Sequence, residues 1–116
     1  MVFQTIQIVK KIKGRFYFKQ TSNGNLIGEW SNYESEPATE SSDLQGEYQP
    51  TVQFKGTYNS TWQENGKAII RELTITKLGK KFKLDWTEIG NNKSDFTGEG
   101  MLCDNILVGD YAYCGT

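Results

Sequence analysis

The stretch from Phe54 to Tyr113 constrains the fold most strongly, because apolar and polar residues alternate along it with a period of two. Successive side chains of a β-strand point to opposite faces, so this alternation predicts strands that each bury one face. Short turn sequences separate the strands, namely Asn65-Gly66, Leu78-Gly79, Gly90-Asn91-Asn92 and Asp104-Asn105. Asn, Asp and Gly accept the positive φ that tight hairpin turns require. The stretch is therefore predicted to be an antiparallel meander.

The first part of the chain carries the same pattern less regularly. Strands are predicted at residues 3–9, 15–20 and 25–32. Asn23-Gly24, between the second and third of these strands, is a typical hairpin signal.

The segment around 33–43 is rich in acidic and small polar residues and has no apolar period. It is therefore predicted to be an exposed acidic loop. The next strand is predicted to begin at Leu44. It should be interrupted or bulged near Pro50, because proline cannot donate a hydrogen bond to a sheet ladder.

Roughly eight strands and no helix are predicted, and these favour an all-β fold. A single up-and-down antiparallel β-barrel spanning residues 1–116 is expected, since closure removes the unpaired edges that an open sheet would expose. Glycines within the predicted strands suit the strong coiling of a small barrel. A two-sheet β-sandwich is the alternative.

The net charge of −1 provides no bulk attraction to nucleic acid or to an anionic membrane, so neither is expected as a partner. The N-terminal residues lack the basic start and uninterrupted apolar run of a secretory signal, and a cytoplasmic location is expected. Cys103 and Cys114 are predicted to lie too far apart for a disulfide and to be free thiols.

The sequence contains no histidine, which excludes histidine-based acid–base catalysis and histidine metal ligands. Two separated cysteines without a histidine partner argue against a thiolate nucleophile or a zinc site. No phosphate-binding loop, nucleophile elbow or paired-carboxylate motif is present. No catalytic residue, metal site or cofactor is therefore predicted. A barrel lyase or isomerase that uses Tyr, Lys, Arg or Asp alone remains an alternative.

Arg71 falls between Ile69 and Leu73 on the apolar face of a predicted strand. A guanidinium is costly there unless it is paired or faces a wet pocket. One interpretation is an anion clamp inside the barrel, which would use the planar fork of arginine donors. The other is an internal ion pair with Asp110 or Glu29, or a bulge that turns Arg71 outward.

Two basic clusters, within residues 10–15 and 77–83, lie at turns that are predicted to share one end of the barrel. Together they would form a positive rim that attracts an anionic small molecule. Ordinary solvated lysines that protect strand edges are the alternative.

Trp30, Tyr58, Trp62 and Trp86 are predicted to converge on the interior. They would either stack on a flat ligand or fill the barrel. A barrel of eight strands has room for little more than side chains or one small ligand.

Three fragments resemble the avidin and streptavidin family, within the wider lipocalin-like (calycin) barrels. IGEWSN is similar to the family's Gly-x-Trp-x-Asn, FKGTYNS to its Phe-x-Gly-x-Tyr-x-Ser/Thr, and FKLDW with SDFTGEG to two later strands. The order of the fragments is the same, although two predicted strands precede IGEWSN here. The resemblance implies a ligand-holding barrel. By position, it implies a pocket lined by Asn32, Tyr58, Ser60, Trp86, Ser94 and Phe96.

These observations predict a non-catalytic barrel that binds or sequesters a small molecule in an aromatic interior, with an anion contact at Arg71. The candidate ligand-binding residues are Trp30, Asn32, Tyr58, Ser60, Arg71, Trp86, Ser94 and Phe96. A protein-interaction or oligomerisation module with a filled barrel is the alternative. Formation of a homo-oligomer stays open under either interpretation.

Overall fold

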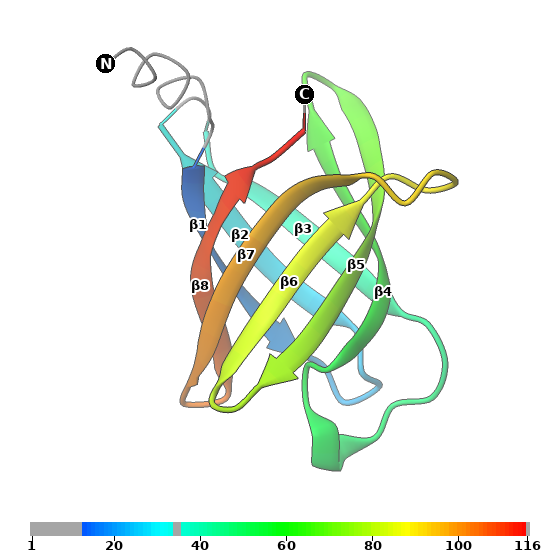
Figure 1. The fold of residues 1–116 in the computed structure, drawn as a ribbon, viewed down its shortest axis with the longest axis vertical. Helices are drawn as coiled ribbons and strands as arrows, with labels where there is room; N and C mark the ends of the chain where they lie inside the picture. Colours follow the sequence, from blue (N-terminus) through cyan, green and yellow to red (C-terminus); the bar gives the residue numbers. More distant parts are fainter. Residues whose placement is uncertain (1–12, 34–35, 116) are drawn as a thin grey trace, which may run out of the picture.

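A computed structural model describes residues 13–33 and 36–115, which form a closed barrel of eight antiparallel strands (Figure 1). The strands are β1 (Lys13–Gln20), β2 (Leu26–Asn32), β3 (Ala38–Leu44), β4 (Gly56–Glu64), β5 (Lys67–Leu78), β6 (Lys81–Thr87), β7 (Ser94–Cys103) and β8 (Ile106–Tyr113). Each strand pairs with the next in sequence, and β8 pairs with β1 to close the barrel. The predicted up-and-down barrel is confirmed.

The strands that compose this barrel differ from the predicted set at its start. The strand predicted at residues 3–9 lies outside the described residues. An additional strand, β3, occupies part of the segment that was predicted to be a loop, so that prediction is wrong for residues 38–43. This segment does alternate, because Glu40 and Ser42 are buried while Thr39 and Ser41 are exposed. Because its inward side chains Glu40 and Ser42 are polar, the period of two does not appear as an alternation of apolar and polar residues.

The prediction for the following strand is also wrong at its beginning. Leu44 ends β3 rather than starting a strand, and β4 begins only at Gly56. Between them the chain leaves the barrel wall and forms a short 3-10 helix, η1 (Pro50–Val52), with proline in its first turn. Phe54 then returns to the barrel with a φ of 69° and is buried. The connection therefore acts as a cover for one end of the barrel.

The hairpin turns follow the sequence signals closely. Asn65 and Gly66 both have positive φ, at 52° and 78°. Asp104 and Asn105 have φ values of 54° and 70°. Two successive residues with positive φ are the requirement of a tight turn whose twist matches that of the flanking strands. These turns fix the register of β4 with β5 and of β7 with β8.

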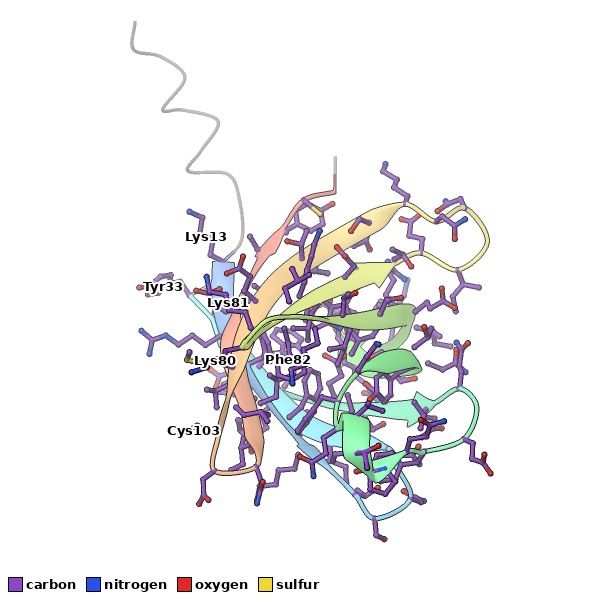
Figure 2. The ribbon with its side chains drawn as sticks, turned by 60° about the horizontal axis from the view of Figure 1, so that its bottom comes forward. Lys13, Tyr33, Lys80, Lys81, Phe82 and Cys103 are labelled. Carbon is purple, nitrogen blue, oxygen red and sulfur yellow. The ribbon has the colours of Figure 1, made fainter. Side chains whose placement is uncertain are left out.

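One end of the barrel is filled by apolar side chains beneath the connection that carries η1. Figure 2 shows Phe82 pointing into the interior there, and its ring meets that of Phe54 edge to face at 6.3 Å. Gln20 links the cover to the wall, since its Oε1 accepts from the backbone N of Phe54 and its Nε2 donates to the hydroxyl of Tyr58. This end is called here the closed end. Phe54, Tyr58 and Phe82 are all buried there, so solvent does not reach the interior between these three residues.

The described residues of the two basic clusters lie at opposite ends of the barrel, so the predicted positive rim is wrong for them. Lys13 is the first residue of β1, whereas Lys80 lies in the turn between β5 and β6, and Lys81 begins β6, at the closed end (Figure 1). In an up-and-down barrel the start of β1 and the end of β5 necessarily lie at opposite ends. No helix within the described ranges has the length and hydrophobicity that a membrane span requires.

Candidate functional site

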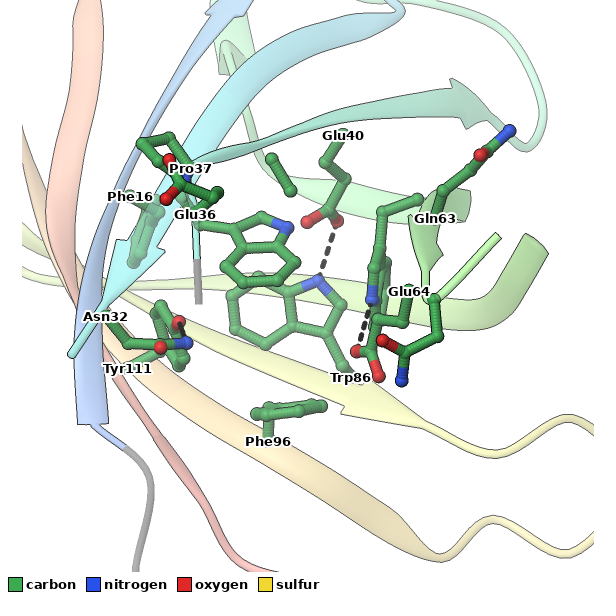
Figure 3. A pocket seen from close by; sticks show the side chains of 14 residues that line it. Phe16, Asn32, Glu36, Pro37, Glu40, Gln63, Glu64, Trp86, Phe96 and Tyr111 are labelled. Carbon is green, nitrogen blue, oxygen red and sulfur yellow. Dashed lines mark hydrogen bonds between the residues drawn. The ribbon is translucent and has the colours of Figure 1, made fainter. Parts of the chain in front are cut away.

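The end of the barrel opposite the closed end contains a cavity of about 520 Å³ (Figure 3). Its mouth is formed by polar residues from the β2–β3 and β4–β5 connections and the strand ends beside them, namely Asn32, Glu36, Gln63, Glu64 and Asn65. All of these except the half-buried Asn32 are exposed, so the cavity reaches the surface.

Six aromatic side chains line the cavity: Phe16, Trp30, Trp62, Trp86, Phe96 and Tyr111. They come from β1, β2, β4, β6, β7 and β8, because inward positions of these strands coincide at this depth. Gly98 leaves space among them. A Cβ at that position would lie 2.6 Å from the backbone O of Asp110, 3.3 Å from the ring of Phe16 and 3.4 Å from the ring of Trp86.

Four of the rings form a closed cycle of edge-to-face contacts around the cavity. Trp30 meets Trp62 at a centroid distance of 6.3 Å, and Trp62 meets Phe96 at 6.1 Å. Phe96 meets Tyr111 at 5.8 Å, and Tyr111 returns to Trp30 at 6.1 Å. The interplanar angles lie between 76° and 84°. Such contacts stabilise each ring in one orientation, and this set of four residues is called here the aromatic cycle.

Glu40 is the most unusual residue of the cavity, because its carboxyl group is buried with a relative exposure of 2%. Its Oε2 accepts a 2.8 Å hydrogen bond from the indole Nε1 of Trp86 (Figure 3) and a second from the hydroxyl of Ser60. The Ser60 hydroxyl also lies 2.6 Å from that of Ser42, directly opposite on β3. Three strands thus hold the carboxyl group in place.

Burial raises the pKa of Glu40 to about 7, from an ordinary value of 4.5. Removal of the carboxylate from water is the dominant cause. The hydrogen bonds from Ser60 and Trp86 favour the charged form and offset part of this effect. The cavity therefore contains a carboxyl group that changes its charge near neutral pH.

Two further polar groups of the cavity are held by hydrogen bonds. The hydroxyl of Tyr111 accepts a 2.8 Å hydrogen bond from Nδ2 of Asn32. Burial raises the pKa of Tyr111, and the negative charges of Glu40 and Glu64 act in the same direction. Trp62 donates its Nε1 hydrogen to Oε2 of Glu64 at 2.8 Å. These contacts orient the ring edges without closing the mouth.

Of the eight predicted ligand-binding residues, the structure brings four together at the cavity: Trp30, Asn32, Trp86 and Phe96. Tyr58 lies in the closed end, where its hydroxyl donates to the backbone O of Phe54 at 2.8 Å. Ser60 is fully buried behind Glu40. Ser94 begins β7 opposite Thr87. None of these three lines the cavity.

Arg71 does not line the cavity either. Its Nε donates to Oδ2 of Asp95 at 2.6 Å, and a terminal nitrogen donates to the backbone O of Ile70. An ion pair was one of the two interpretations, but its predicted partners, Asp110 and Glu29, were wrong, because Arg71 pairs with Asp95 instead. The actual partner is made available by the irregularity between β6 and β7.

That irregularity lies between two successive pairs, Trp86 with Phe96 and Thr87 with Ser94. Asp95 is the extra residue of β7 at this bulge, and it is buried with a relative exposure of 6%. A bulge redirects side chains locally. The sequence pattern of β7 did not reveal it.

Glu40 is among the cavity residues that the sequence did not predict. The inward face of β3 consists of Ala38, Glu40, Ser42 and Leu44. Apart from Leu44 these residues are small or polar, so hydropathy alone does not distinguish them from their outward neighbours. Metal binding has no comparable feature, since no group of three or more Cys, Asp or Glu side chains suited to a metal ion occurs within 13–33 and 36–115.

No protein-family model, curated protein or solved structure matches this chain, so the resemblance to avidin-like barrels rests on the short sequence motifs alone.

Proposed function

We propose that the protein binds a small organic molecule in the aromatic cavity and does so without catalysing its conversion. The observation that carries this proposal is the asymmetry of the barrel interior. One end is filled by side chains, whereas the other holds an open cavity of about 520 Å³. Small-molecule sites are typically concave, mostly apolar and roughly 300–1,000 Å³ in volume.

The composition of the cavity wall supports the same proposal. Rings such as Trp30 and Phe96 are only partly buried, although they belong to the inward face of their strands. A bound molecule would remove their remaining apolar surface from water, which is favourable. The edge-to-face contacts keep the rings in place beforehand, so little side-chain freedom would be lost on binding.

The polar groups of the cavity support selectivity rather than turnover. Glu40, Asn32 and the Tyr111 hydroxyl are fixed by neighbouring hydrogen bonds. A few fixed polar groups in an apolar site are typical of recognition. The avidin-like motifs add support, since three of the residues that they mark, Asn32, Trp86 and Phe96, line the cavity.

A titration with the neutral dye N-phenylnaphthylamine tests this proposal, because its fluorescence rises in apolar surroundings. We expect saturable binding, and loss of binding when Ala38→Phe fills the cavity from β3. The matched control is Glu29→Phe, which adds the same ring on the exposed face of β2, at a position paired with Thr39. Equal dye binding by the wild-type protein and the folded Ala38→Phe variant would contradict the proposal.

A further inference from the structure

The charged side chains that line the cavity all carry the same sign. Glu36, Glu40 and Glu64 are acidic, and no Lys or Arg occurs among the described lining residues. The basic residue predicted to serve the interior, Arg71, is engaged by Asp95 outside this lining. The potential inside the cavity is therefore negative whenever these carboxyl groups are ionised.

Glu40 is the strongest indication of the ligand's charge, because its buried carboxyl group forms no ion pair with a Lys or Arg of residues 13–33 and 36–115. The ion pairs found within the described ranges join Arg71 to Asp95, Lys81 to Glu99, and Lys83 to Asp85. Buried carboxylates are costly unless they are paired as well as hydrogen-bonded.

The hydrogen bonds of Glu40 leave room for such a pairing. Both of its donors, the indole of Trp86 and the hydroxyl of Ser60, are neutral, and both reach the same oxygen, Oε2. Oε1 receives neither of these bonds. Figure 3 shows the carboxyl group of Glu40 extending from β3 into the cavity.

The aromatic cycle around the cavity favours a ligand with a positive charge, opposite to that of Glu40. The face of an aromatic ring is electron-rich, and a cation over it is attracted most strongly by Trp and then by Tyr and Phe. The cycle of Trp30, Trp62, Phe96 and Tyr111 contains all three types. Aromatic walls combined with a carboxylate form a common setting for ammonium groups.

We propose that the ligand is an organic cation, a protonated amine or a quaternary ammonium compound, whose charged group pairs with Glu40 within the aromatic cavity. This inference rests on the proposed function, since it names the chemical class that the same cavity accepts. The apolar part of such a molecule would lie against the side chains of the aromatic cycle. An anionic molecule, which the sequence had predicted, would instead meet Glu40 and Glu64, and the described lining has no basic residue to balance them.

Three probes of the same shape and different charge test the inference through competition with N-phenylnaphthylamine. They are phenethylamine, phenethyl alcohol and phenylacetate, measured at about pH 8, where an alkylamine is still protonated. We expect the amine to bind about tenfold more tightly than the alcohol and the carboxylate to bind most weakly, because a charge pair in a partly desolvated site favours one sign.

Glu40→Gln removes the negative charge and keeps the size of the side chain. We expect this variant to lose about tenfold in affinity for phenethylamine and to change by less than about twofold for phenethyl alcohol. Retained dye binding reports an intact cavity. Glu29→Gln, a change on the exposed face of β2, is the matched control and should leave all three affinities unchanged.

The outcomes separate this inference from the proposed function. Equal affinity for amine and alcohol, or unchanged amine affinity in a folded Glu40→Gln variant, overturns the cation inference while dye binding still supports a small-molecule site. Failure of all three probes to displace the dye at millimolar concentration also overturns it. If Glu40→Gln does not fold, the order of the three probes on the wild-type protein decides. Absence of dye binding in the cavity overturns the proposed function itself.

Discussion

The indole Nε1 of Trp86 donates a 2.8 Å hydrogen bond to Oε2 of Glu40, joining β6 to β3 across the interior of the barrel. These strands are not neighbours in the sheet, so the contact exists only because the barrel is closed. Trp86 and Glu40 are both nearly fully buried, at 4% and 2% exposure. The pair places a carboxyl group inside the cavity, and from it we expect a pH response of the fold.

The first prediction concerns the stability of the fold against pH. The pKa of Glu40 is raised to about 7 in the folded state from 4.5, so the folded protein binds this proton more tightly than the unfolded chain does. The contribution of Glu40 to the free energy of unfolding is therefore constant below about pH 4.5, falls as pH rises to about 7 and is constant above it. The total loss is on the order of 3 kcal/mol.

Urea denaturation of the wild-type protein and Glu40→Gln between pH 4.5 and pH 8 measures this contribution. The difference in unfolding free energy should shift in favour of the variant as pH rises. Glu64 on β4, Tyr111 on β8 and Glu36 at the mouth are the other titratable groups of the cavity, and all are kept in the variant. A pH-independent difference would contradict the prediction.

The second prediction concerns the hydrogen bond itself. Trp86→Phe removes the donor and leaves Oε2 of Glu40 with Ser60 alone, so we expect a loss of about 1–3 kcal/mol at pH 8, where Glu40 is mostly charged. Combining Trp86→Phe with Glu40→Gln forms a double-mutant cycle. Because the amide oxygen of Gln can still accept from Trp86, the cycle measures how much the charge of Glu40 strengthens the bond, and simple additivity of the two changes would show that the charge adds nothing.

The sequence was sufficient to predict the barrel because the period of two and the turn residues are local signals. Asn65-Gly66 and Asp104-Asn105 adopt the positive φ that their types allow, and each fixes a hairpin register. Once the register is fixed, inward and outward faces follow along each strand. Trp30 and Trp86 were therefore correctly expected to face the interior.

Glu40 was missed because the signal that identifies its strand is not local. An inward glutamate is tolerated only when donors from other strands reach it, and here they come from Ser60 on β4 and Trp86 on β6. Neither donor can be assigned before the barrel is closed. Asp95 escaped prediction for a related reason, since the bulge that frees it depends on pairing between β6 and β7.

The third prediction concerns Tyr58, which the sequence and the avidin-like motifs had assigned to the ligand. Its hydroxyl joins Gln20 to the backbone O of Phe54 in the closed end, and burial raises its pKa to about 12. Tyr58→Phe should cost about 1–2 kcal/mol in unfolding free energy because it leaves these partners unsatisfied. Dye affinity should remain unchanged.

Tyr17→Phe serves as the control for this change. It removes a hydroxyl from a half-buried tyrosine on the outward face of β1, opposite to that of the buried Phe16 and Phe18. Its effect on the free energy of unfolding should be smaller than that of Tyr58→Phe. A large loss of dye affinity in a stable Tyr58→Phe variant would instead place Tyr58 in the binding site.

The last prediction separates the ion pair of Arg71 from ligand binding. Arg71 and Asp95 have side-chain exposures of 23% and 9%, so Arg71→Met leaves a largely buried carboxylate without its cation. The expected loss is about 1–3 kcal/mol, because solvent screens only part of the interaction. Adding Asp95→Asn should restore part of it by removing the unpaired charge. Lys81→Met, which breaks the exposed pair with Glu99, should have little effect on unfolding by urea.

Phenethylamine affinity should be the same in Arg71→Met and the wild-type protein, whereas an anion site at Arg71 would appear as selective loss of phenylacetate binding.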